Sequence, residues 1–207
     1  MEPARLGWAG FHVWESFWVG GVRRGALFRS FDGVRLTVRV AFDDGVGAPF
    51  AAQSLLSVGP ETWDACAFRQ EPGGLRTELG REAAGLGADT LPSSGEYLLV
   101  ARIAESSRGG AEFGRIDEAQ PDAGPAPARV RRRPGGAIDF PDGRIRQAER
   151  LDVVAGGMRV ATYWAVGGVV VRSAWAGALT FLCTEAEALE GLDPGISSFL
   201  RQGFVAP

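Results

Sequence analysis

Residues 145–183 read IRQAERLDVVAGGMRVATYWAVGGVVVRSAWAGALTFLC. Short runs rich in apolar residues are interrupted in this stretch by the pairs Gly156-Gly157 and Gly167-Gly168. Adjacent glycines supply the positive φ angles that tight hairpin turns require. The stretch therefore predicts four successive antiparallel strands, at Ile145–Val154, Met158–Val166, Val169–Trp175 and Ala178–Cys183.

The first part of the chain is divided in the same way. Residues 35–42 alternate between apolar and polar side chains, with Leu36, Val38 and Val40 on one face, which is typical of a half-buried strand. Glycine pairs and Asp-Gly pairs separate further short runs of this kind. They predict strands at Phe11–Val19, Gly25–Phe31, Arg35–Phe42, Trp63–Arg69 and Leu75–Leu79.

Helices are expected in only two places. Residues 94–106 suit either a buried strand or a helix, and Ser93 or Ser94 as N-cap with Glu96 in the first turn favours the helix. The C-terminal tail, residues 184–207, has a capping-box spacing at its start and a second helix start at Asp193-Pro194.

These elements predict a mainly β fold, on the border of the α+β class, in one domain over residues 1–207. The outer strands of an antiparallel sheet leave backbone N–H and C=O groups unpaired. A meander can protect them by curling into a barrel or into a half-barrel around a helix. Lipocalin-like and lipoprotein-carrier-like architectures both fit by analogy, although neither family's motif is present. The proline-containing residues 114–136 predict a surface excursion, and Arg129–Arg133 within it a solvated edge strand.

Composition excludes several kinds of chemistry. All 22 basic residues are Arg, and His12 is the only histidine. A chain without Lys cannot form a Schiff base or anchor pyridoxal phosphate, and one histidine cannot make a two-histidine metal site. No nucleotide-binding glycine motif, nucleophile elbow or CxxC pair occurs, and the acidic pair Asp117-Glu118 has no metal-ligand pattern around it. We therefore expect no metal and no cofactor.

Charge and hydropathy argue against two classes of binding partner, nucleic acids and membranes. A net charge of −3 argues against nucleic-acid binding, and no apolar run is long enough to span a membrane. Residues 1–5 show no signal-peptide pattern, so we expect a cytoplasmic protein in which Cys66 and Cys183 are free thiols. The absence of Lys and Asn suits a bacterial genome of high GC content, and the oligomeric state is not indicated.

The strand at residues 11–19 carries the first candidates for a site. Side chains alternate in a strand, so Glu15 shares a face with Phe11 and Phe17, while His12 faces the other way. A buried Glu15 is a candidate general acid or base, and the alternative is a structural ion pair with an arginine such as Arg172. His12 is a weaker candidate for the same role.

Aromatic residues in the predicted strands are the candidates for ligand binding. Trp14, Trp18, Trp63, Trp164 and Trp175 could line a concave surface that binds a flat or apolar ligand, with Arg172 beside them. They could equally be ordinary core residues. Tyr163 is a candidate hydrogen-bond donor or a satisfied structural hydroxyl.

Three functions remain open. The first is binding of a hydrophobic or aromatic small molecule in the cavity of a barrel or half-barrel. The second is a cofactor-free enzyme of specialised metabolism, such as a cyclase, isomerase or dehydratase, that uses the same cavity. The third is a structural or protein-interaction module. Polar groups that face the cavity would favour the enzyme, and an apolar lining would favour binding alone.

Overall fold

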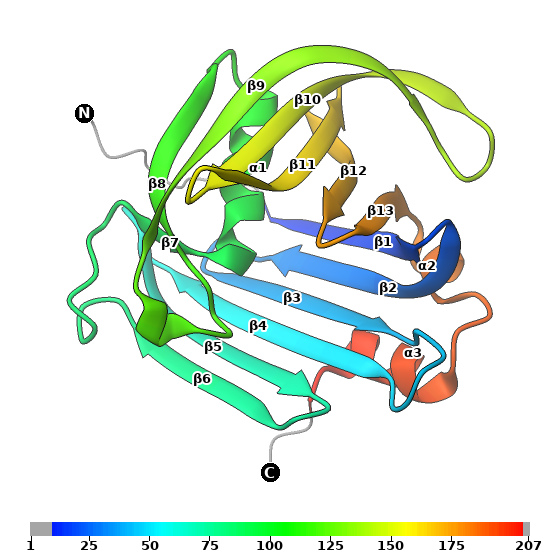
Figure 1. Cartoon of the computed structure of the whole chain (residues 1–207), viewed down its shortest axis with the longest axis horizontal. Helices are drawn as coiled ribbons and strands as arrows, with labels where there is room; N and C mark the ends of the chain where they lie inside the picture. Colours follow the sequence, from blue (N-terminus) through cyan, green and yellow to red (C-terminus); the bar gives the residue numbers. More distant parts are fainter. Residues whose placement is uncertain (1–9, 205–207) are drawn as a thin grey trace.

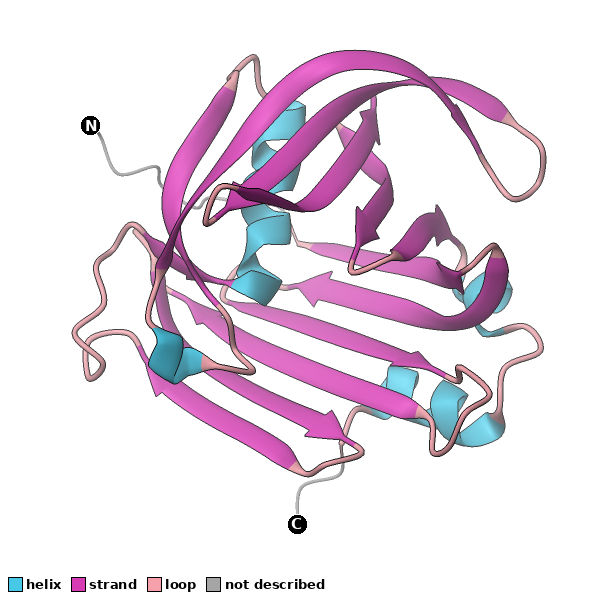
Figure 2. Ribbon diagram, viewed as in Figure 1, coloured by secondary structure: helices cyan, strands magenta, loops and turns pink. Residues whose placement is uncertain are grey.

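A computed structural model describes residues 10–204. Thirteen strands form one sheet in the order β6-β5-β4-β3-β2-β1-β13-β12-β11-β10-β9-β8-β7. Their bounds are β1 Phe11–Val19, β2 Val22–Phe31, β3 Arg35–Phe42, β4 Phe50–Val58, β5 Trp63–Glu71, β6 Leu75–Gly80, β7 Thr90–Pro92, β8 Gly110–Ile116, β9 Ala126–Asp139, β10 Ile145–Ala155, β11 Met158–Val166, β12 Val169–Trp175 and β13 Ala178–Cys183. Strands predominate in the molecule, as Figure 2 shows.

Neighbouring strands are antiparallel throughout, except that the short β7 runs parallel to β8. The hairpins turn where glycine pairs were expected to place them, and Gly156, Gly157, Gly167 and Gly168 all have positive φ. All four strands predicted between residues 145 and 183 are confirmed. The meander is a consequence of these tight turns, since a two-residue turn leaves consecutive strands side by side.

One pairing departs from sequential order. β1 pairs with β13, so that Phe17 lies opposite Thr180. This ladder joins the meander β1–β6 to the meander β8–β13 in a single curved surface, with β6 and β7 as its outer strands. The sheet is not closed, so the half-barrel rather than the closed barrel is confirmed.

Helix α1 (Glu96–Glu105) lies within the curve of the sheet, between β8–β11 and β2–β4 in Figure 1. The helix predicted for residues 94–106 is thus confirmed, and it fills the concave face. Its buried side chains include Val100 and Ile103, and they pack against Leu151 and Val153 of β10. A curled sheet needs such a filling, because its inward-facing apolar side chains must be removed from water.

Helices α2 (Glu185–Leu189) and α3 (Pro194–Gln202) cover the opposite face, beside β1, β2 and β3. Both start as the sequence predicts: Thr184 and Glu187 form a capping box, and the Asp193 carboxylate accepts hydrogen bonds from two backbone N–H groups. Leu200 and Ile196 pack on Ala26 and Ala41 of the sheet.

Two expectations need correction. Residues 114–136 are not a surface excursion, because they contain the end of β8 and the start of β9. Arg129–Arg133 is not an edge strand, since β9 lies between β8 and β10. Pro127 lies near the first residue of β9, and Pro134 lies where the β9–β10 register shifts, two positions at which a ladder hydrogen bond is not required.

A further correction concerns strands that the sequence did not predict. β4, β7 and β8 are the three. β4 contains Gln53, Ser54 and Ser57 among small residues, so its apolar alternation is weak. β7 has only three residues, which is too short for any period to show.

Leu151 tests the packing of α1. Its side chain is 0% exposed in the cluster that joins the helix to β10. We expect Leu151→Ala to lower the free energy of unfolding by about 3 kcal/mol, because it removes apolar contacts and leaves a cavity. Urea denaturation measures the change. Gln147→Ala, at an exposed position of the same strand, is the control, and an effect of similar size in the control would contradict the assignment.

Candidate functional site

An apolar pocket, here called the α1 pocket, lies between α1, β7, β8 and the start of β5, and has a volume of about 470 Å³. Most of its wall is apolar. The apolar lining residues are Val58, Trp63, Leu91, Leu98, Leu99, Ile103, Ala111 and Phe113. Charged residues of both signs complete the lining, namely Glu61, Asp89, Arg102, Arg108 and Glu112. The size is that of a small-molecule site.

Trp63 fixes one wall of the α1 pocket. Its ring is 1% exposed, and its Nε1 donates a hydrogen bond of 2.9 Å to the carbonyl oxygen of Thr90. The Thr90 hydroxyl in turn donates to the carbonyl oxygen of Gly87 at 2.6 Å. The first bond ties the start of β5 to β7, and the second holds Thr90 to the turn that precedes β7.

Gly95 allows α1 to approach that wall. A Cβ atom at Gly95 would lie 2.8 Å from side-chain atoms of both Leu56 and Leu91, which is too close for carbon atoms. Glycine at the first turn therefore lets the helix pack directly on β4 and β7. The predicted N-cap is wrong in detail, since Gly95 occupies the N-cap position and no side chain caps the helix there.

Ser93 and Ser94 instead bind a buried carboxylate. Glu118, in a loop after β8, accepts hydrogen bonds from the Ser54 hydroxyl at 3.1 Å, the Ser93 hydroxyl at 3.3 Å, and the Ser94 backbone N–H at 3.0 Å and hydroxyl. Cys66 Sγ lies 3.6 Å from the same carboxylate. Burial, reinforced by this carboxylate, raises the pKa of the Cys66 thiol. Glu118 was expected to be an ordinary loop residue, and it holds the loop to the start of α1.

A second buried polar group lies on α1 itself. Glu96 Oε1 accepts a hydrogen bond of 2.9 Å from the Tyr163 hydroxyl, and Glu96 Oε2 pairs with Arg115 Nε at 3.0 Å. Burial raises the pKa of Glu96, although Arg115 and the Tyr163 hydroxyl act in the opposite direction. Burial also raises the pKa of Tyr163, and the adjacent Glu96 adds to the rise. Tyr163 is thus a satisfied donor that connects β11 to the helix.

Glu15 belongs to a third buried group. Its side chain is 3% exposed and forms an ion pair with Arg29, and Thr180 donates a hydrogen bond to it. The Thr180 and Ser173 hydroxyls lie 2.7 Å apart. The Arg29 guanidinium lies 4.3 Å from the centre of the Tyr97 ring, and burial lowers the Arg29 pKa. The group links β1, β2 and β13 beneath α1.

Arg172 is not the partner of Glu15, which corrects the pairing suggested from sequence. Its guanidinium lies 4.6 Å from the Trp164 ring centre and 5.3 Å from that of Phe181. Arg29 takes the ion pair because β1 and β2 are neighbours in the sheet. Their register could not be derived from the sequence of either strand alone.

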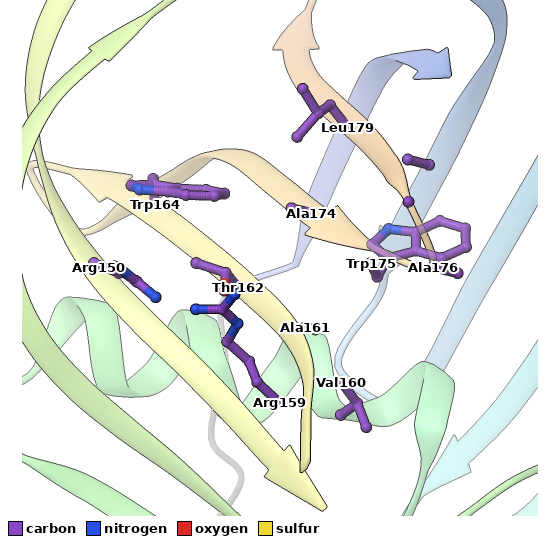
Figure 3. Close-up of a pocket in the computed structure, with 12 residues that line it drawn as sticks. Arg150, Arg159, Val160, Ala161, Thr162, Trp164, Ala174, Trp175, Ala176 and Leu179 are labelled. Carbon is purple, nitrogen blue, oxygen red and sulfur yellow. The ribbon is translucent and has the colours of Figure 1, made fainter. Parts of the chain in front are cut away.

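A second pocket, here called the β-face pocket, extends over β10–β13 and has a volume of about 440 Å³ (Figure 3). Trp164 and Trp175 lie on either side of Ala174 in this view. Arg150, Arg159 and Thr162 are also among the lining residues. The pocket thus contains two of the predicted ligand-binding tryptophans, whereas Trp63 lines the α1 pocket.

The remaining candidates lie elsewhere. Trp14 packs beside α2 and α3, and its ring centre is 4.7 Å from that of Phe28. His12 is exposed, and its ring lies 5.1 Å from the same phenylalanine. Trp18 contacts Phe181 at a ring distance of 6.3 Å and donates a hydrogen bond to the Ser16 hydroxyl. None of these three residues lines the two pockets described above.

A third pocket, of about 500 Å³, lies on the other side of α1 and includes Phe11, Val13, Tyr97 and Arg102. It borders residue 10, where the described chain begins. Within residues 10–204, no group of three or more His, Cys, Asp or Glu side chains is placed to hold a metal ion. None of the helices in that range has the length and apolarity needed to cross a bilayer.

Comparison with known proteins gives little guidance. No protein-family model matches the chain, and no curated protein sequence matches it. Among solved structures, it is similar to the beta-barrel-like protein of domain of unknown function DUF1849 from Brucella abortus. The two share 9% sequence identity and a TM-score of 0.47, over 87% of this chain and 98% of that one. The function of this chain must therefore be inferred from its own side chains.

The raised pKa of Glu96 predicts a pH dependence of stability. Because the folded protein holds this proton more tightly than the unfolded chain, the contribution of Glu96 is greatest below the ordinary carboxyl pKa and falls as the pH rises through the higher folded value. Glu96→Gln removes this titration. We expect the stability of the variant relative to the parent to improve between about pH 4 and about pH 8 in urea denaturation.

Glu78→Gln is the control for this measurement, since Glu78 is exposed on β6. Its difference in stability from the parent should show no comparable rise over the same interval. The assignment would be contradicted if the free energy of unfolding of the Glu96→Gln variant fell relative to that of the parent as the pH rises.

Proposed function

We propose that this protein binds an apolar small molecule in the α1 pocket of its half-barrel. The observation that carries the proposal is the lining of this pocket, in which Trp63, Leu98, Leu99 and Phe113 surround about 470 Å³. Removal of a ligand's apolar surface from water against such walls is favourable by roughly 25 cal/mol per Å². The charged residues at the pocket carry both signs and do not select a charged ligand.

Hydrogen bonds that hold the walls of the α1 pocket in place support a binding function, because such walls do not close on one another when the pocket is empty. Trp63 is fixed through Thr90, and the start of α1 is fixed through the hydrogen bonds of Ser93 and Ser94 to Glu118. A site whose walls are held before the ligand enters loses less conformational entropy on binding. The polar groups at this end of the half-barrel therefore act as supports for an apolar surface.

The alternative of a cofactor-free cyclase, isomerase or dehydratase needs an acid or base that faces its substrate. Glu15 and Tyr163 line none of the three pockets described above. Glu15 is engaged by Arg29 and Thr180, and Tyr163 by Glu96. The contacts of these two residues are structural, and the mainly apolar lining of the α1 pocket is the reason that binding is the function we propose.

Leu99 offers a direct test, because it is half-buried and lines the α1 pocket. We expect Nile red, an apolar dye whose fluorescence rises on transfer from water, to bind the purified protein. Leu99→Gln should raise the dissociation constant of the dye roughly tenfold, since a buried leucine side chain contributes about 1.5–3 kcal/mol. Fluorescence titration measures the change.

Leu75→Gln is the matched control, a half-buried leucine on β6 that does not line the pocket. It should leave dye affinity unchanged. Equal affinities of the parent and both variants, or no binding by the parent, would sink the proposal. Mass spectrometry of small molecules that copurify with the parent then identifies natural ligands.

A further inference from the structure

The β-face pocket differs from the α1 pocket in the character of its lining. Ala174 leaves room on the face of the sheet that carries Thr162 and the Trp164 indole, whereas Trp175 packs toward the opposite face and borders the pocket at the end of the β12–β13 hairpin (Figure 3). Aromatic rings stack favourably on flat partners at such surfaces. The volume of about 440 Å³ suits a molecule of one or two rings.

The charges around this pocket are mainly positive. Arg150 and Arg159 line it, and no carboxylate of the described residues does so. Arg150 is held in place by Asp152, with Nε–Oδ1 and Nη2–Oδ2 distances of 2.9 and 3.1 Å. The same carboxylate lies 3.6 Å from Arg133 Nε, so one negative charge serves two arginines.

Thr162 completes the arrangement that orients Arg150. Its hydroxyl donates a hydrogen bond of 3.0 Å to Asp152, and this carboxylate is buried. Two of the five guanidinium N–H donors of Arg150 are used by Asp152, and the others remain for an anion. Arg159 is exposed, and no ion pair within residues 10–204 engages it.

We propose that the β-face pocket is a second binding site, and that its ligand is a planar aromatic carboxylate. The ring system lies over Ala174 beside the Trp164 indole, and the carboxylate accepts hydrogen bonds from Arg159 and Arg150. Guanidinium groups bind carboxylates through charge-assisted, often paired hydrogen bonds. The site is separate from the α1 pocket and does not depend on the function proposed for it.

Isothermal titration calorimetry with two probes of nearly equal shape tests this proposal. The first probe is 2-naphthoate, which carries the carboxylate, and the second is 2-naphthamide, which is neutral. At low ionic strength, where exposed charges are least screened, we expect naphthoate to bind about tenfold more tightly than naphthamide. Arg159→Gln should weaken naphthoate binding by about fivefold and leave naphthamide binding unchanged.

Two controls make the outcome decisive. Arg76→Gln removes an exposed arginine from β6, and it should change the affinity for neither probe. Leu99→Gln alters the α1 pocket alone, so it should leave naphthoate binding intact even where it reduces dye binding. Equal binding of the two probes, no binding of either, or an equal loss of naphthoate affinity in the Arg159 and Arg76 variants would overturn the proposal.

Discussion

The structure depends on the burial of one short helix in the concave face of a curled sheet. Thirteen strands present more inward-facing apolar surface than an open sheet can leave in water, and α1 covers it with Leu98, Val100 and Ile103. The helix also carries Glu96 and Tyr97 into the same interior. Both the apolar core and the buried polar groups are therefore arranged around α1.

Three of the four buried acidic side chains within residues 10–204 have a common role. Glu15, Glu96 and Glu118 each bind side chains from segments that are distant in the sequence, through Arg29, Tyr163 and Ser54 respectively. A buried charge that loses its partner is strongly unfavourable, so each group specifies one arrangement of the strands it joins. The pockets, in contrast, are lined mainly by other residues. The acids that join distant strands are thus distinct from Glu61, Asp89 and Glu112, which line the α1 pocket.

Much of the fold could be predicted from the sequence where local chemistry decides the structure. Glycine pairs located the β10–β11 and β11–β12 hairpins, and the capping box located α2. β4 could not be found in this way, because Ser54 and Ser57 interrupt its apolar pattern. The prolines hid the full length of β9, of which only Arg129–Arg133 was predicted as strand. Prolines are tolerated there because a strand start and a register shift need fewer ladder hydrogen bonds.

The candidate sites were less predictable, because they depend on contacts between distant strands. Alternation in β1 placed Glu15 and His12 on opposite faces, and burial of the first with exposure of the second agrees with this. The partnership of Glu15 with Arg29 required the β1–β2 register. Trp63 and Phe113 line one pocket only because β5, β7 and α1 come together in space. The residue pattern of a single strand does not indicate which residues of other elements will lie next to it.

The β1–β13 ladder has a consequence for biosynthesis. Phe17 pairs with Thr180, so the two halves of the sheet cannot join until residues 178–183 have also left the ribosome. During that time β1 has a neighbour on one side only, and its unpaired backbone groups can pair with another nascent chain. Contacts between such distant residues also slow folding. We therefore expect the free edge of β1 to stay open to pairing with other chains until β13 has been made.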